Sequence, residues 1–202
     1  IMRFIMYSVS TLFYTCAAIL ILDFVGIYTK GIVDVNYCRP VFAYIIILAQ
    51  FFNAIRIPYQ LVVQAAGHYK QTKKGAIVEP IINLTISILF VLKFGLVGVA
   101  VGTLVATVFR TVQYSLYMGK NIVPRSMGSV AKRILVCSLE AAVVIAIMKV
   151  LPFSEVDNYV KWIEKAVVTF CLCSAAVFGG GFVFYKKELT KTLQKLRSII
   201  KR

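Results

Sequence analysis

Residues 41–64, VFAYIIILAQFFNAIRIPYQLVVQ, form an apolar run long enough to decide the fold of this chain. A bilayer core of ~30 Å is crossed by ~20 mostly apolar residues in a helix. The apolar residues are continuous rather than alternating, which predicts a membrane-spanning helix and not a barrel strand. The same run contains Asn53, Arg56 and Gln60, side chains that are costly to expose to hydrocarbon, and these need a separate explanation.

Composition places the whole chain in the membrane class. Of its 202 residues, 60% are hydrophobic and 15% are charged, whereas soluble domains carry about 25% charged residues. Six apolar segments have the length of a span, at about 3–27, 41–64, 76–93, 95–118, 132–151 and 163–185. We therefore predict an all-α, polytopic transmembrane helix bundle of six spans over residues 1–185.

Residues 186–202 form a polar, basic tail after the last predicted span. Helical spacing places four apolar residues of this tail on one face, surrounded by lysines: Leu189, Leu193, Leu196 and Ile200. This pattern favours a helix lying on an anionic membrane surface. A solvated tail is an equal alternative.

The distribution of basic residues predicts the orientation of the spans. The net charge is +15, and the lysines and arginines near the span ends collect on one side of the predicted topology. That side holds Arg3, Lys70, Lys73, Lys74, Lys120, Arg125, Lys132, Arg133, Lys186, Lys187, Lys191, Lys195, Arg197, Lys201 and Arg202, against Lys30, Arg39, Lys93, Lys149, Lys161 and Lys165 on the other. The positive-inside rule then places both chain ends in the cytoplasm of a cell membrane.

Two further expectations follow from the same residues. Because the basic residues lie between apolar runs and in the tail, we expect anionic lipid head groups and no nucleic acid as partners. The chain begins with Ile1 rather than methionine, so we expect it to be a piece of a longer protein.

Polar residues in the second predicted span share one helical face. Gln50, Asn53, Arg56, Gln60 and Gln64 fall within an arc of about 120°. An intramembrane arginine is tolerated where it faces a bundle interior or a wet cavity. We therefore predict that Asn53, Arg56, Gln60 and Gln64 line a water-accessible, substrate-binding cavity. The alternative is a structural network of polar side chains that holds helices together.

The fourth predicted span contributes Arg110, about 12 Å from the cytoplasmic end of its helix at ~1.5 Å rise per residue. Glu140 lies at a similar depth in the fifth, so we expect the two to be partners, or Glu140 to carry protons for ion coupling. Glu79 begins a further polar stripe at the inner mouth and is a second candidate for ion coupling or an ion pair, although solvation alone could account for it there.

Catalytic and metal-binding motifs are not visible in the sequence. No two cysteines form a CxxC pair, and four of the five lie inside apolar runs, which argues against a disulfide framework or zinc site. The five are Cys16, Cys38, Cys137, Cys171 and Cys173. The single histidine stands in a lysine-rich loop, and no catalytic triad or phosphate-binding loop is present. We expect no enzyme activity, no cofactor and no metal.

The order of motifs over residues 53–122 resembles a known family. A helix ends in QAAGHYKQTK (64–73) and is followed by EPIINLTISI (79–88), FGLVGVAVGT (94–103) and a basic loop. This order resembles the polysaccharide-biosynthesis flippases of the multidrug/oligosaccharidyl-lipid/polysaccharide exporter superfamily. The resemblance implies two six-helix lobes with cytoplasmic termini, of which this chain is similar to the C-terminal one, so that its partner is a missing N-terminal lobe.

The resemblance also implies a task. Such proteins move undecaprenyl-pyrophosphate-linked oligosaccharides, for example lipopolysaccharide O-antigen units, across the cytoplasmic membrane by alternating access. In that role Arg56 and Arg110 are candidates for contacting the pyrophosphate and sugars. The alternatives are an ion-coupled multidrug or cation exporter of the same superfamily, a flippase for lipid-linked peptidoglycan precursor, and a non-transporting scaffold or polymerase subunit.

Overall fold

The computed structural model describes residues 2–32, 34–124, 127–151 and 156–200, with the side chains of the last range described to residue 186 and at Thr190. This part of the chain consists of helices and their connections and contains no strand, which confirms the predicted all-α class. Its long helices are α1 (Met2–Tyr28), α2 (Pro40–Ala65), α3 (Tyr69–Phe94), α4 (Leu96–Asn121), α5 (Met127–Val150) and α6 (Tyr159–Ile200).

Membrane-spanning potential is present in most of these helices. Within the described residues, five are long and apolar enough to cross a membrane: α1, α2, α3, α4 and the Tyr159–Lys186 part of α6. The fifth helix of the chain, α5, has 24 residues but is not among them. Its four charged residues, Lys132, Arg133, Glu140 and Lys149, are spread along the helix and interrupt its apolar length.

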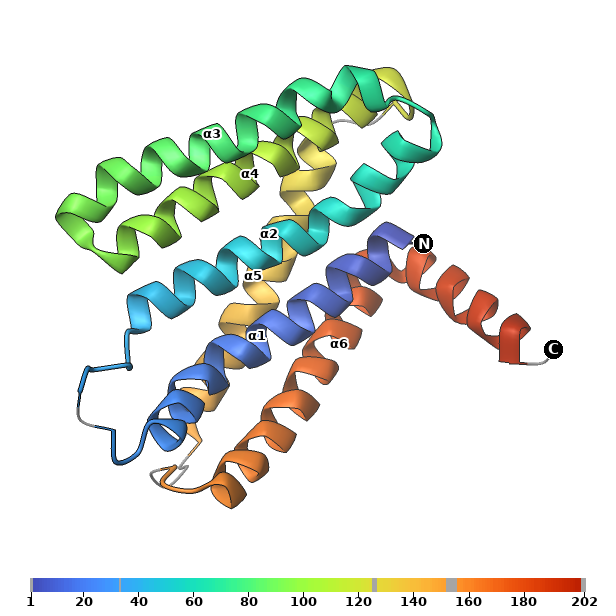
Figure 1. Cartoon of the computed structure of the whole chain (residues 1–202). Helices are drawn as coiled ribbons and strands as arrows, with labels where there is room; N and C mark the ends of the chain where they lie inside the picture. Colours follow the sequence, from blue (N-terminus) through green and yellow to red (C-terminus); the bar gives the residue numbers. More distant parts are fainter. Residues whose placement is uncertain (1, 33, 125–126, 152–155, 201–202) are drawn as a thin grey trace.

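The helices run between two ends of the bundle (Figure 1). One end carries both chain termini and the α2–α3 connection, and the other carries the α1–α2 and α3–α4 connections. Helices α3 and α4 form an antiparallel pair that packs on α2 through α4, while α1 joins α2 to α5 and α6. Helix α5 extends between the same two ends as its neighbours.

Local sequence explains where the chain turns. Pro40 occupies the first turn of α2, where its missing N–H costs no helical hydrogen bond. Gly95 adopts φ +57°, a conformation that side-chain-bearing residues rarely adopt, and reverses the chain between α3 and α4 in a single residue. This reversal aligns α3 and α4 along their full lengths and brings the polar residues of both helices to one interface.

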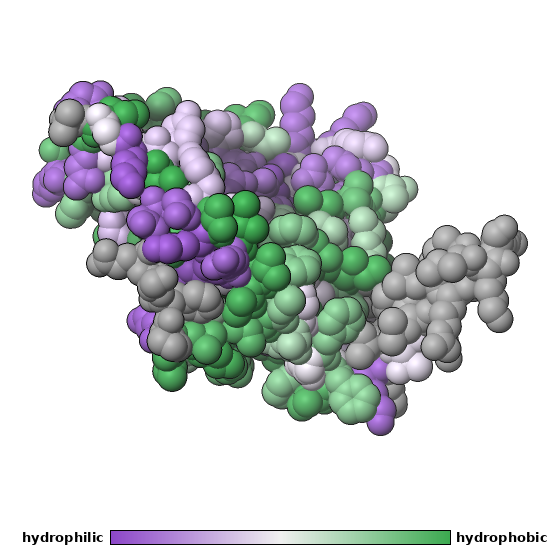
Figure 2. Space-filling model, turned by 90° about the horizontal axis from the view of Figure 1, so that it is seen from below, coloured by the Kyte–Doolittle hydropathy of each residue, from purple (hydrophilic) through white to green (hydrophobic). Residues whose placement is uncertain are grey.

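The outer surface of the bundle is apolar. On α3, the side chains of Leu84 and Leu92 are 63% and 84% exposed. Figure 2 shows apolar residues covering a large part of the face seen there, beside patches of hydrophilic ones. Exposed apolar area of this extent is typical of contact with lipid or with another protein. Inside, Tyr7 of α1 and Tyr59 of α2 are both buried, and their hydroxyls lie 3.0 Å apart.

Helix α6 changes direction toward its C-terminal part. Tyr185 has φ −136° and ψ 32°, which are not helical values, and the following segment points away from the bundle in Figure 1. This kink lies directly before the predicted tail, 186–202. The apolar stripe predicted for the tail, Leu189, Leu193, Leu196 and Ile200, lies outside the described side chains.

Candidate functional site

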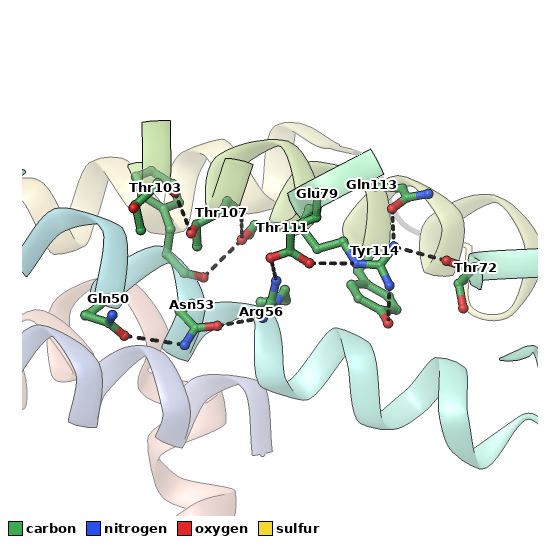
Figure 3. Close-up of polar contacts among 12 residues, drawn as sticks. Gln50, Asn53, Arg56, Thr72, Glu79, Thr103, Thr107, Thr111, Gln113 and Tyr114 are labelled. Atoms are coloured by element: carbon green, nitrogen blue, oxygen red, sulfur yellow. Dashed lines mark hydrogen bonds and ion pairs between the residues drawn. The ribbon is translucent and has the colours of Figure 1, made fainter. Parts of the chain in front are cut away.

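A chain of polar contacts begins on α2 with the residues of the predicted stripe (Figure 3). The Nδ2 of Asn53 donates to Gln50 Oε1 at 3.4 Å, and the Oδ1 of Asn53 accepts a hydrogen bond of 2.7 Å from Arg56 Nη2. The three residues are one helical turn apart, so their side chains reach one another along the same face. This local chain orients the guanidinium of Arg56 toward α3.

Glu79 of α3 lies between the two predicted arginines. Its Oε1 accepts a hydrogen bond of 2.7 Å from Arg56 Nη1, and its Oε2 lies 3.5 Å from Arg110 Nε on α4. One carboxylate therefore bridges three helices. Glu79 was expected near the membrane interface, where solvation could account for it. In the structure α3 begins at Tyr69, and Glu79 is in the third turn as part of an ion-pair cluster.

Arg110 is held by more partners than Arg56. Its Nη1 donates to the backbone carbonyl of Thr72 at 3.1 Å and to the side-chain oxygen of Gln113, and its Nη2 donates to the Tyr114 hydroxyl at 2.9 Å. The guanidinium carbon also lies 4.3 Å from the centre of the Tyr114 ring. With these contacts satisfied, Arg110 ties α4 to α3.

Gly75 makes this arrangement sterically possible. A side-chain carbon at position 75 would collide with the Gln113 amide and with the Arg110 guanidinium. Gly75 is buried in the first part of α3, where the helix passes closest to these two side chains. The backbone of α3 can therefore approach Arg110 closely enough for the Thr72 carbonyl to accept its hydrogen bond.

The three charged side chains of the cluster differ in their exposure, and this difference separates their roles. The Arg110 side chain is 5% exposed, whereas those of Arg56 and Glu79 are 17% and 28% exposed. The Nε of Arg56 has no hydrogen-bond partner although it is buried. With two arginines and one glutamate, the cluster has a formal charge of +1. Arg110 thus fixes Glu79, Glu79 orients Arg56, and Arg56 is the arginine that an anionic group could reach.

The remaining predicted residues of α2 do not join the cluster. Gln60 and Gln64 are half-buried on the later turns of the helix, and among the described side chains neither makes a hydrogen bond. They keep their amide groups available, but the structure does not bring them to Arg56 or Arg110 through any contact. The stripe is thus divided into a bonded half, Gln50 to Arg56, and an unbonded half.

The expected partnership between Arg110 and Glu140 is wrong, since Arg110 pairs with Glu79. Glu140 lies on α5 and faces α6, where a side-chain carbon at Gly180 would come within 2.9 Å of its carboxyl carbon. With Tyr7, Ser8 and Arg133 it lines a cavity of about 20 Å³. Within the described part of the chain, Glu140 has neither an ion pair nor a hydrogen bond.

Two larger cavities lie on the other side of α2. One of about 280 Å³ is lined by α1, α2 and α5, including Thr11, Tyr14 and Ser138. Another of about 470 Å³ is lined by the same helices and α6, including Lys149 and Lys165. Asn53, Arg56, Gln60, Gln64 and Arg110 line neither of them. The arginine cluster therefore also has the character of the helix-joining network that the sequence left open as an alternative.

Several residues of the cluster were not predicted from the sequence. Thr72, Gly75 and Gln113 were outside the predicted polar stripes, because Thr72 and Gly75 precede the apolar part of α3. Gln113 is three residues after Arg110 and could have been found as its neighbour on one helical face. Thr72 takes part through its backbone carbonyl, which no side-chain pattern reveals.

Comparisons with known proteins add no assignment: no family model, no curated protein and no solved structure matches this chain.

Proposed function

We propose that this chain is one six-helix lobe of a flippase that moves an undecaprenyl-pyrophosphate-linked oligosaccharide across the cytoplasmic membrane by alternating access. The proposal rests on the resemblance of residues 53–122 and on one observation. That observation is the partly exposed Arg56, held in a fixed orientation by Asn53 and Glu79. Fixed guanidinium groups are suited to pyrophosphate oxygens, with which they form charge-assisted hydrogen bonds.

The mechanism follows from the cost of moving charge through lipid. A pyrophosphate cannot cross hydrocarbon unaided, because burying an isolated charge is prohibitively costly. The cluster carries a formal charge of +1, so an anion approaching Arg56 gains attraction without removing the Glu79 contact. Movement of this lobe against a second lobe would expose the bound head group to each side in turn, while the polyprenyl chain stays in the bilayer.

Arg56→Ala tests the proposal directly in the full-length parent protein. Mass spectrometry of lipids that co-purify in mild detergent should detect a polyprenyl-pyrophosphate oligosaccharide with the parent and a loss of it in the variant. Arg56→Lys should retain part of the binding, because it keeps the charge but not the forked geometry. Arg39→Ala, in the exposed α1–α2 connection, is the matched control and should bind as the parent does.

A cation exporter of the same superfamily is the second candidate. Glu140 favours it, because an acidic side chain within a helix bundle and without a partner among the described residues is suited to a cation. Cationic amphiphiles recovered with the parent, with no polyprenyl pyrophosphate and no effect of Arg56→Ala, would favour this candidate over the flippase.

A further inference from the structure

Three sulfur-bearing side chains from three helices meet in a buried cluster away from the arginines. Met148 of α5 and Cys173 of α6 belong to one buried cluster, and the partly buried Cys16 of α1 packs against that cluster. Cys173 is 1% exposed and Met148 is 8% exposed. Helices α1 and α6, which carry the two cysteines, pack against each other. The proposed transport function uses none of these residues.

The sulfur of Met148 keeps its lone pairs available. The hydroxyl of Thr169 is 3.7 Å from Met148 Sδ, but it also lies 2.7 Å from the backbone carbonyl of Lys165, to which it donates. A hydroxyl has one proton to donate. Thr169 donates it to the Lys165 carbonyl oxygen, because that oxygen is closer and is a stronger acceptor than a thioether sulfur. The thioether is thus positioned by Thr169 while remaining free to bind a third group.

An access route leads to this cluster. Met148 also lines the cavity of about 470 Å³ between α1, α2, α5 and α6. Lys149 and Lys165 line the same cavity, and Lys165 pairs with Asp23 at 2.7 Å. A small ion in the cavity would meet the Met148 sulfur without separation of the helices. The charge of Lys149 would offset the negative charge that two thiolates bring to the site.

We propose that Cys16, Cys173 and Met148 form a binding site for a soft monovalent metal ion of the Cu(I) and Ag(I) class. Thiolate and thioether ligands select such ions, and two or three sulfur ligands match their low coordination numbers. Zinc sites use four nitrogen, sulfur or oxygen ligands, and the described residues contain no cluster of three His, Cys, Asp or Glu side chains. Binding displaces both thiol protons, and the resulting site has a net charge of −1.

The test uses the reduced full chain in detergent, titrated with Cu(I) without oxygen against a colorimetric Cu(I) chelator. In a variant with Cys38→Ser, Cys137→Ser and Cys171→Ser, which keeps only the two cluster thiols, one Cu(I) should bind per chain. Cys16→Ser or Cys173→Ser in that background should abolish binding. Cys171→Ser alone is the matched control, because Cys171 is on the same helix but exposed, and it should not change the stoichiometry at the site.

X-ray absorption of the Cu(I)-loaded chain gives a second readout that needs no change to the two thiols. The copper ion should have three sulfur neighbours in the parent chain. It should have two in Met148→Leu, a substitution of similar volume. Circular dichroism and size-exclusion chromatography verify that each variant is folded. Binding that survives Cys16→Ser in a folded chain, or a copper shell of nitrogen and oxygen, would overturn the proposal.

Discussion

At the scale of single residues, Glu79 determines the arrangement of the polar cluster. Within the described residues it is the only acidic group paired with either arginine, and it contacts Arg56 and Arg110 with different oxygens. Without it, two positive side chains would face an interface of three helices with nothing between them to neutralise either charge. Removing one partner of a buried ion pair is costly mainly for this reason. The cluster therefore depends more on its glutamate than on either arginine.

Glu79→Gln should lower the free energy of unfolding by about 1–3 kcal/mol, the usual cost of leaving a buried hydrogen-bonding group unsatisfied. Gln preserves the shape but removes the charge that both guanidinium groups use. Thermal unfolding in detergent, followed by circular dichroism, measures the change. Glu164→Gln on α6 is the control, because Glu164 is exposed. Equal stability of the two variants would mean that Thr72, Gln113 and Tyr114 hold Arg110 without Glu79.

Glu140 is a second acidic residue with its own prediction. If it carries protons for transport, Glu140→Gln should leave cargo binding intact and remove the dependence of transport on the proton gradient. Its position supports this test, since it lines a small cavity and has no ion pair within the described part of the chain. Transport in vesicles with and without an imposed gradient gives the readout. Unchanged gradient dependence would assign Glu140 a structural role against Gly180 on α6.

At the scale of elements, the α3–α4 pair depends on glycine. A side-chain carbon at Gly98 would lie 2.6 Å from the backbone nitrogen of Val91, and one at Gly102 would lie 2.8 Å from the carbonyl oxygen of Asn83. These neighbours are backbone atoms, which cannot move aside without shifting a helix. The close approach of the two helices keeps Glu79 and Arg110 within reach of each other.

Gly98→Ala should therefore destabilise the bundle by about 1–3 kcal/mol, the usual cost of overpacking. Gly26→Ala is the matched control on α1, since nothing lies within 4 Å of a side-chain carbon there. Alanine in an open helical position gains roughly 0.5–1 kcal/mol over glycine, so the two variants should change stability in opposite directions. Thermal unfolding in detergent compares them, and a stabilising Gly98→Ala would contradict the close packing.

The sequence predicts the helices well because apolar length is a local property. Predicted segments 3–27 and 41–64 agree with α1 and α2 within a few residues. Helix α3 begins at Tyr69, seven residues before the predicted apolar segment 76–93. Hydropathy marks the apolar part of a helix, while a lysine-rich first turn is helical too.

The candidate site was less predictable, because pairing depends on which helices are neighbours. Arg110 and Glu140 have similar depths in their helices, and that similarity suggested a pair. The depth of a residue in its helix does not specify which neighbouring helix its side chain faces. The short α3–α4 turn brings Glu79 to Arg110 instead. The same limit applies to Cys16 and Cys173, which the packing of the first and last helices brings to one cluster. No spacing rule along the chain reveals a contact of this kind.

At the scale of the whole molecule, the two ends of the bundle differ in a way that can be measured. Both termini lie at one end, and the α1–α2 connection with Cys38 lies at the other (Figure 1). Helix α5 extends between these ends, so six crossings would return the chain to its starting side, although α5 is not among the five helices that are long and apolar enough to cross a membrane. The orientation of the bundle in the membrane then follows from its basic residues.

Cys38 tests this orientation. It is exposed, and its backbone N–H donates a hydrogen bond of 3.0 Å to Asn36 Oδ1, which leaves the thiol open to reagents. A membrane-impermeant thiol reagent applied to intact cells should label Cys38, with the labelled peptide identified by mass spectrometry. Lys74→Cys, an exposed position near the opposite end, should react only after the membrane is opened. The reverse pattern would invert the topology. Labelling of both positions in intact cells would mean that the α1–α2 and α2–α3 connections lie on the same side of the membrane. A chain that crosses the membrane with each of its six helices does not allow that result.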